Sequence, residues 1–126
     1  MLNEIEETVR NALINIAKRG NRASSRISYQ DLADQCRLVL NGQRLDMMNI
    51  DHRNYLGDIL GNISHEEDES DRPILSALVF NEQKGQPGKG FYDLAKELGR
   101  QKPMESDLVF WSNELNRIYE FWSKSK

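Results

Sequence analysis

The sequence predicts a single domain of 126 residues that is mainly α-helical with a small β-hairpin, an α+β class. Two observations support this class. Apolar residues recur every three or four positions near both ends and in the middle of the chain, as in amphipathic helices. Residues 72–99, RPILSALVFNEQKGQPGKGFYDLAKELG, instead contain a short apolar run followed by a glycine-rich loop, as in a strand that leads into a turn.

The composition limits the class of protein. The net charge is -3, with 29% charged residues, so any contact with nucleic acid must come from a local basic patch. No apolar run approaches the roughly 18 residues of a membrane span, and the N-terminus lacks a secretory signal, so we expect a cytoplasmic protein without a membrane partner. The single cysteine, Cys36, fits a reducing compartment.

The first predicted helix begins near Asn3, which can cap it, and ends at Gly20. Ile14 lies opposite its apolar stripe and is a candidate for a partner surface. A basic stretch without acidic residues follows, and it contains Arg19, Arg22 and Arg26. These arginines are candidate phosphate contacts for nucleic acid, and the alternative is an ordinary solvated loop.

A short second helix is predicted after Ser28, which can cap it together with Asp31. Its buried face consists of four residues at helical spacing: Tyr29, Leu32, Ala33 and Cys36. We therefore interpret Cys36 as a packed structural thiol. The stretch from Arg37 to Asp51 is predicted to be a loop with a turn at Asn41-Gly42.

The third helix is predicted over residues 51–65. Its inner face is apolar, and its outer face carries Asn54, Gly57, Asp58 and Gly61, with Arg53 at the flank. Each glycine lowers helix propensity by about 1 kcal/mol relative to alanine, so the pair is expected to allow close approach of a neighbouring helix or a ligand.

Candidate metal ligands lack a suitable arrangement. The acidic run at residues 66–71 has no calcium-loop spacing and is predicted to be a solvated loop. His52 and His65 are thirteen positions apart, and His52 falls on the apolar side of its helix. We therefore predict no catalytic residue, no metal and no cofactor.

The apolar run Ile74–Phe80 is predicted to be a buried strand, followed by a loop over residues 82–90 that carries Lys84 and Lys89, and then by a helix that ends at Gly99. A phosphate-binding loop for nucleotides is disfavoured, because Gly85 and Gly88-Lys89 are too close and Gly90 stands where a hydroxyl is needed.

The last predicted helix follows Ser106 and has a strong apolar stripe of six residues: Leu108, Trp111, Leu115, Ile118, Tyr119 and Trp122. Phe110 and Phe121 lie off this stripe and widen the apolar surface. They belong either to a broad core contact or, with Ile14, to a surface for a protein partner or a homodimer.

The order of helix, capped helix, third helix, strand and glycine-rich loop resembles a winged helix-turn-helix domain with extra N- and C-terminal helices. ISYQDLA, YLGDIL and the loop after the strand resemble the winged DNA-binding domain of the DNA alkyltransferase family, over residues 27–91. That family has a reactive Pro-Cys-His-Arg motif, which is matched here by four residues without a thiol: Pro73, Ile74, Leu75 and Ser76. The resemblance therefore implies at most a non-reacting relative.

Two functions follow as hypotheses. The first is a small non-enzymatic protein that binds double-stranded DNA through Arg53 and Asn54 on the recognition helix and Lys84 and Lys89 on the wing, with further phosphate contacts from the basic stretch. The second is a protein-protein interaction module or accessory subunit of a bacterial regulatory or defence complex. Salt dependence separates them, because counterion release weakens DNA binding steeply.

Overall fold

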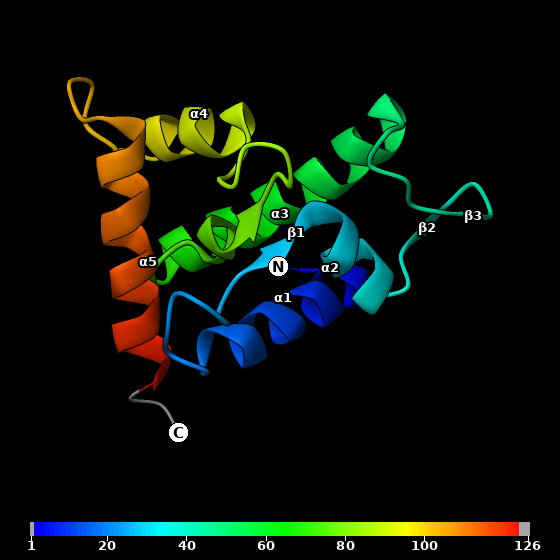
Figure 1. Cartoon of the computed structure of the whole chain (residues 1–126), viewed down its shortest axis with the longest axis horizontal. Coiled ribbons are helices and arrows are strands. Elements are labelled where there is room, and N and C mark those ends of the chain that lie inside the picture. Colours follow the sequence, from blue (N-terminus) through cyan, green and yellow to red (C-terminus); the bar gives the residue numbers. More distant parts are fainter. Residues whose placement is uncertain (1, 124–126) are drawn as a thin grey trace.

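The computed structural model describes residues 2–123 as one mainly helical domain with five α-helices, one 3-10 helix and two small two-stranded sheets in that range (Figure 1). The helices are α1 (Glu4–Ala17), α2 (Tyr29–Gln35), α3 (Ile50–Glu69), η1 (Leu75–Leu78), α4 (Lys89–Glu97) and α5 (Asp107–Ser123). The strands are β1 (Ile27–Ser28), β2 (Val39–Leu40), β3 (Gln43–Arg44) and β4 (Val79–Phe80). No helix in the described range is long and apolar enough to cross a membrane.

The predicted helix starts are confirmed by their caps. The Asn3 side chain accepts a hydrogen bond from the backbone N–H of Glu6, and the Glu6 carboxylate accepts one from the backbone N–H of Asn3, a reciprocal capping box. Ser28 Oγ accepts from the backbone N–H of Asp31 at 3.0 Å. These caps set where α1 and α2 begin, and therefore which faces of the two helices are buried.

The core lies where α1, α3 and α5 surround the short central segment of η1 and β4 (Figure 1). In the view of Figure 1, α1 and α3 run across the molecule, α5 runs along one side, and α4 lies across the top. η1 is packed against all three long helices, so its side chains are surrounded by protein.

The predicted strand Ile74–Phe80 is mostly wrong. Leu75–Leu78 form a 3-10 helix, and only Val79–Phe80 are a strand, which pairs in parallel with β1. Every residue from Ile74 to Val79 is buried, so the sequence is apolar throughout and has no period that would distinguish a strand from a helical turn.

The β-hairpin lies elsewhere than predicted. β2 and β3 pair antiparallel around the Asn41-Gly42 turn, which is confirmed, within the stretch predicted to be a loop. The glycine-rich loop has only one antiparallel bridge, between Asn81 and Gln86. Its neighbour β4 is parallel to β1, so this loop does not connect two strands of one sheet.

The prediction of a solvated acidic loop is also wrong. α3 continues to Glu69, and the side chain of Glu67 is completely buried between the guanidinium groups of Arg10 and Arg72. Asp68 accepts a 2.7 Å hydrogen bond from Arg100. Because arginines from other parts of the chain compensate these carboxylates, the last turn of α3 is packed rather than solvated.

In α5 the predicted stripe is shifted at its start. Leu108 is 55% exposed, whereas Phe110 is completely buried and its ring lies 5.9 Å from that of Phe91. The prediction that Phe110 contributes to a partner surface is therefore wrong. Phe91 of α4 provides this contact, which the sequence could not indicate.

Candidate functional site

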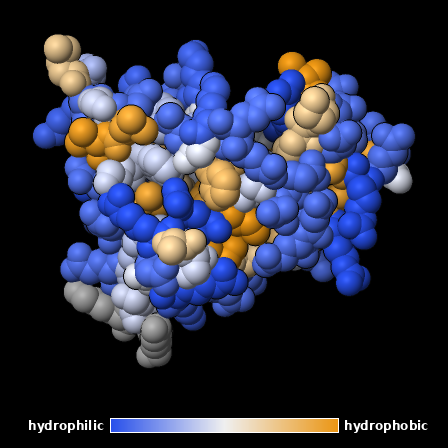
Figure 2. All heavy atoms as spheres, viewed as in Figure 1, coloured by the Kyte–Doolittle hydropathy of each residue, from blue (hydrophilic) through white to orange (hydrophobic). Residues whose placement is uncertain are grey.

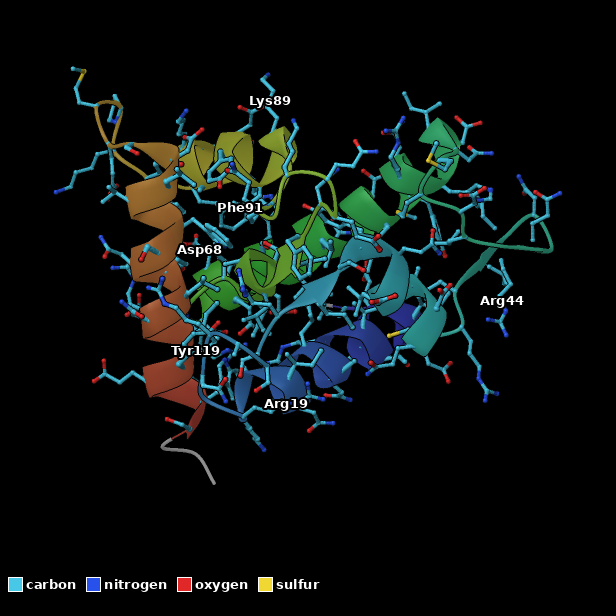
Figure 3. The ribbon with its side chains drawn as sticks, in the orientation of Figure 1. Arg19, Arg44, Asp68, Lys89, Phe91 and Tyr119 are labelled. Atoms are coloured by element: carbon cyan, nitrogen blue, oxygen red, sulfur yellow. The ribbon has the colours of Figure 1, made fainter. Side chains whose placement is uncertain are left out.

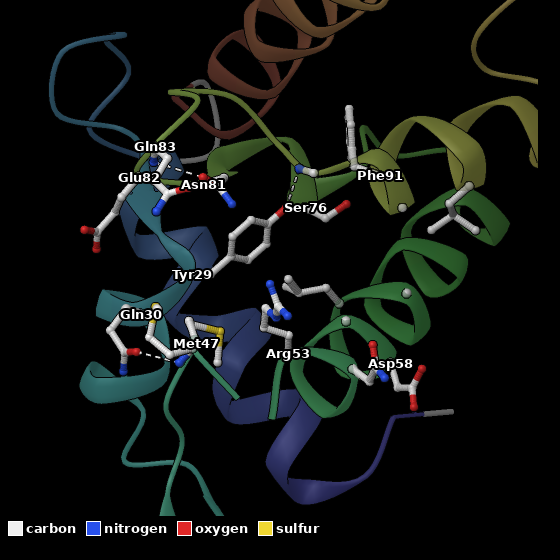
Figure 4. Close-up of a pocket in the computed structure, with 18 residues that line it drawn as sticks. Tyr29, Gln30, Met47, Arg53, Asp58, Ser76, Asn81, Glu82, Gln83 and Phe91 are labelled. Carbon is white, nitrogen blue, oxygen red and sulfur yellow. Dashed lines mark hydrogen bonds between the residues drawn. The ribbon is translucent and has the colours of Figure 1, made fainter. Parts of the chain in front are cut away.

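An open cleft of about 800 Å³ lies between α2, the first half of α3, the loop after β4 and the start of α4 (Figure 4). Its lining residues come from six segments of the chain: Tyr29, Gln30, Met47, Met48, Arg53, Asn54, Gly57, Asp58, Leu60, Gly61, Ser76, Asn81, Glu82, Gln83, Gly88, Gly90, Phe91 and Leu94. The predicted recognition helix and part of the predicted wing therefore face the same space.

The wall of the cleft that α3 forms lacks side chains at two glycines. Gly57 and Gly61 are one helical turn apart, and a Cβ atom added at either position would meet no heavy atom within 4 Å. Gly90 in the first turn of α4 is equally open. Among the described residues no heavy atom lies within 4 Å of a Cβ added at these glycines, so the predicted close approach of a neighbouring helix is wrong, and the approach of a ligand stays a prediction.

Tyr29 joins α2 to the opposite wall. Its hydroxyl oxygen accepts a 2.9 Å hydrogen bond from the backbone N–H of Gly88, immediately before α4 (Figure 4). Burial raises the pKa of the Tyr29 hydroxyl, and the hydrogen bond from Gly88 opposes this rise. The hydroxyl is therefore neutral at physiological pH, and it keeps its own proton for donation.

Gln30 fixes the lower rim. Its Oε1 accepts from the backbone N–H of Met47 at 2.8 Å, and its Nε2 donates to the carbonyl oxygen of Leu45 at 2.9 Å. These two bonds hold the segment that follows the β2–β3 hairpin against α2. The β2–β3 hairpin therefore projects from the domain at a point beside the cleft.

Arg53 is the cation of the cleft. Its side chain points from α3 into the space between Tyr29 and the helix (Figure 4), and it is exposed. Within residues 2–123, no hydrogen bond or ion pair engages its guanidinium group. Ser76 is nearby and almost completely buried, but its hydroxyl is already shared with that of Ser64 at 2.7 Å. Arg53 is therefore available for an external anion.

The lysines of the predicted wing are exposed near this space. Lys84 lies in the tight loop that Asn81 holds, where the Asn81 side chain accepts from the backbone N–H of Gln83 at 2.9 Å. Lys89 opens α4, forms a 3.2 Å ion pair with Asp93, and points away from the body of the molecule (Figure 3). An exposed pair of this kind is weak, so Lys89 can exchange Asp93 for another anion.

The three arginines of the basic stretch are not part of this cleft. Arg22 donates hydrogen bonds to Ser112 and Asn116 of α5, the shortest at 2.6 Å to the Ser112 hydroxyl. Arg26 lies 5.8 Å from the ring centre of Phe80 and also contacts Trp111. Arg19 lies at the opposite end of the molecule from Lys89 (Figure 3). The seven predicted contacts therefore do not form one surface.

The exposed apolar side chains outside the cleft are scattered over the surface. Figure 2 shows hydrophobic residues in separate patches among hydrophilic ones on the face in view. Of the predicted partner surface, Ile14 is half-buried against the core, and Phe121 is 39% exposed with its ring against that of Trp122. The most exposed apolar side chains near α5 are instead those of Met104, Leu108 and Val109.

Several cleft residues were missed from the sequence. Tyr29 was assigned to a buried helix face, which is only partly correct because its ring also borders the cleft. The sequence carries no signal for Gln30 or Met47 as cleft residues, because their place depends on tertiary contacts, and it indicates Ser76 only through the resemblance to the reactive motif. Cys36 is outside the cleft, packs partly against the core, and has a thiol pKa raised by burial.

The described residues contain no group of three or more histidine, cysteine, aspartate or glutamate side chains that could hold a metal ion. Comparison with protein-family models, curated protein sequences and solved structures found no match to this chain.

Proposed function

We propose that this protein is a non-enzymatic DNA-binding protein related in element order to winged helix-turn-helix domains, with α3 as the recognition helix and the loop at residues 82–90, which is not part of a β-hairpin, in the position of the wing. The observation that carries the proposal is the guanidinium group of Arg53, which no protein group engages within residues 2–123 and which points into an open cleft. A guanidinium group of this kind binds phosphate oxygens or a guanine edge through two parallel hydrogen bonds.

The segments that resemble the winged domain of DNA alkyltransferases support the same proposal, because all of them border the cleft. Tyr29 belongs to ISYQDLA, Gly57 and Asp58 to YLGDIL, and Gly88 to the glycine-rich loop. In the four residues that match the reactive motif, Ile74 stands at the position of the reactive cysteine and offers no nucleophile. The proposed activity is therefore binding without transfer of an alkyl group.

The charges of the cleft determine how strongly we expect it to bind DNA. Asp58 and Glu82 line it together with Arg53, so the surface is mixed rather than uniformly basic. From the cleft and the loop beside it we expect three phosphate contacts, from Arg53, Lys84 and Lys89. Three contacts correspond to a slope of about -2.7 for the logarithm of the binding constant against the logarithm of salt concentration.

The test is fluorescence anisotropy with labelled duplex DNA, single-stranded DNA and RNA between about 50 and 200 mM salt, where counterion release is visible. The expected result is preferential, salt-sensitive binding of the duplex that is lost when Arg53, Lys84 and Lys89 are all changed to alanine. The matched control changes three exposed cations outside the cleft, Arg19, Lys96 and Lys102. If this control weakens binding as strongly, the cleft is not the interface.

A protein-interaction module is the second candidate, and the exposure of Met104, Leu108 and Val109 favours it. These side chains are 96%, 55% and 53% exposed and lie within six positions of one another. Two results together would favour this candidate over DNA binding. The wild type would bind no duplex at the lowest salt concentration, and it would capture a protein partner that the Leu108→Asp variant does not bind.

A further inference from the structure

The β2–β3 hairpin is a basic projection beside the cleft. Residues 37–45 contain Arg37 and Arg44 and no acidic residue. Both arginines are exposed, and no hydrogen bond or ion pair within the described residues engages either side chain. In Figure 1 the hairpin extends away from the helices, and Figure 3 shows Arg44 on it, clear of the body of the domain.

The base of the hairpin is anchored. Leu38 and Leu45 flank it and are only 5% and 3% exposed, and the backbone N–H of Leu45 donates to the carbonyl of Leu38 at 3.2 Å. Gln30, which lines the cleft, also binds the carbonyl oxygen of Leu45. Arg44 is therefore carried on an element that is fixed to the rim of the cleft, and Arg37 lies at the end of α2, immediately before the base of this element.

The turn is fixed as well. Asn41 and Gly42 both have positive φ, 53° and 79°, as the two central residues of a type I′ turn require. This turn matches the natural twist of the two strands and so favours the hairpin conformation, while the anchored base sets the direction in which the hairpin leaves the domain. A preorganised element loses less conformational entropy on binding than a free loop does.

We propose that this hairpin is a second DNA-binding element, in which Arg37 and Arg44 contact phosphate groups of the duplex that α3 engages. The inference rests on the proposed function. A phosphate backbone fits this hairpin better than a protein partner does, because the projection is basic, Val39 is its one strongly exposed apolar side chain, and each strand is only two residues long. Strands of that length offer too few backbone groups to bind an added strand.

The test compares the salt dependence of duplex binding for the wild type, the double variant Arg37→Gln/Arg44→Gln, and Arg37→Lys/Arg44→Lys, which keeps the charge. Losing two phosphate contacts should reduce the magnitude of the salt slope by about 1.8, which corresponds to roughly 60-fold weaker binding at 0.1 M salt. The lysine variant should retain most of the slope. The control Arg19→Gln/Lys102→Gln removes the same charge elsewhere, and circular dichroism checks that each variant is folded.

The outcomes distinguish the two proposals. If the wild type binds duplex DNA through Arg53 while Arg37→Gln/Arg44→Gln binds equally well, the hairpin assignment is overturned and the proposed function stands. An equal loss in the Arg19→Gln/Lys102→Gln control would also overturn it, since total charge would then explain the effect. If the wild type binds no duplex at about 50 mM salt, the proposed function itself fails, and the inference about the hairpin fails with it.

Discussion

Replacing the two cleft glycines of α3 by alanine should make the protein more stable. Gly57 and Gly61 lie within a 20-residue helix, and an added Cβ meets no heavy atom within 4 Å at either site. Only the difference in helix propensity then remains, about 1 kcal/mol for each site, so the double variant should gain about 2 kcal/mol. For a domain of this size each substitution should raise the Tm by about 3 to 6 °C.

Gly99 provides the matched control. Its surroundings are equally open, but its φ is +76°, where a side chain strains the backbone. Gly99→Ala should therefore cost about 1 kcal/mol, in contrast to the gain at Gly57. Urea unfolding followed by circular dichroism measures all variants. A loss of stability for Gly57→Ala would mean that this face of α3 is not open, and the argument for the cleft would be refuted.

The same positions also separate stability from binding. Gly61→Leu introduces a good helix former at the site and directs a large side chain into the cleft. We expect this variant to be at least as stable as the wild type and to bind duplex DNA more weakly. Unchanged DNA affinity in a folded Gly61→Leu variant would show that DNA does not enter the cleft.

Three further predictions concern the rest of the domain. Glu67→Ala should destabilise the protein by about 3 kcal/mol in urea unfolding, because it leaves two arginines without their buried carboxylate; no loss would contradict the role given to this ion pair. Arg22→Ala should lower the free energy of unfolding by about 1 kcal/mol, because it loses the hydrogen bonds to α5, and it should leave DNA affinity unchanged. Weaker DNA binding of this variant in fluorescence anisotropy would show that Arg22 belongs to the DNA interface. Burial, with a smaller contribution from Asp107, raises the pKa of Tyr92 to about 12. Since the unfolded state loses this proton near pH 10, stability should fall as the pH rises from about 10 to 12, and Tyr92→Phe should fall less steeply in unfolding measured across that range.

The helices could be predicted because their signals are local. Asn3 and Ser28 stand at the helix starts, and their caps depend only on residues three positions away. The Asn41-Gly42 turn is equally local, since two residues with positive φ set it. These features depend only on residues that are close together in the sequence, so they can be predicted from it.

The failures share a physical cause, which is compensation from distant parts of the chain. Glu67 appears solvated in sequence, but Arg10 is 57 positions away and neutralises it. Phe110 appears to lie off the stripe until α4 brings Phe91 against it. In the same way, Arg22 appears to be a free loop cation, but α5 binds it. The cleft could be anticipated only in part, from Arg53 and the glycines.

The parallel pairing of β1 with β4 has a consequence for the order of folding. Ile27 pairs with Val79, so this two-residue ladder closes a loop of about 50 residues that contains α2, the hairpin, α3 and η1. Loop closure of this length costs more free energy than two strand residues can return, so the ladder forms only after α3 has packed. Because Val79 is completely buried and Ser28 is only 2% exposed, the backbone amides that bond across this ladder should exchange with solvent more slowly than those at the exposed tip of the β2–β3 hairpin, which exchange by local opening.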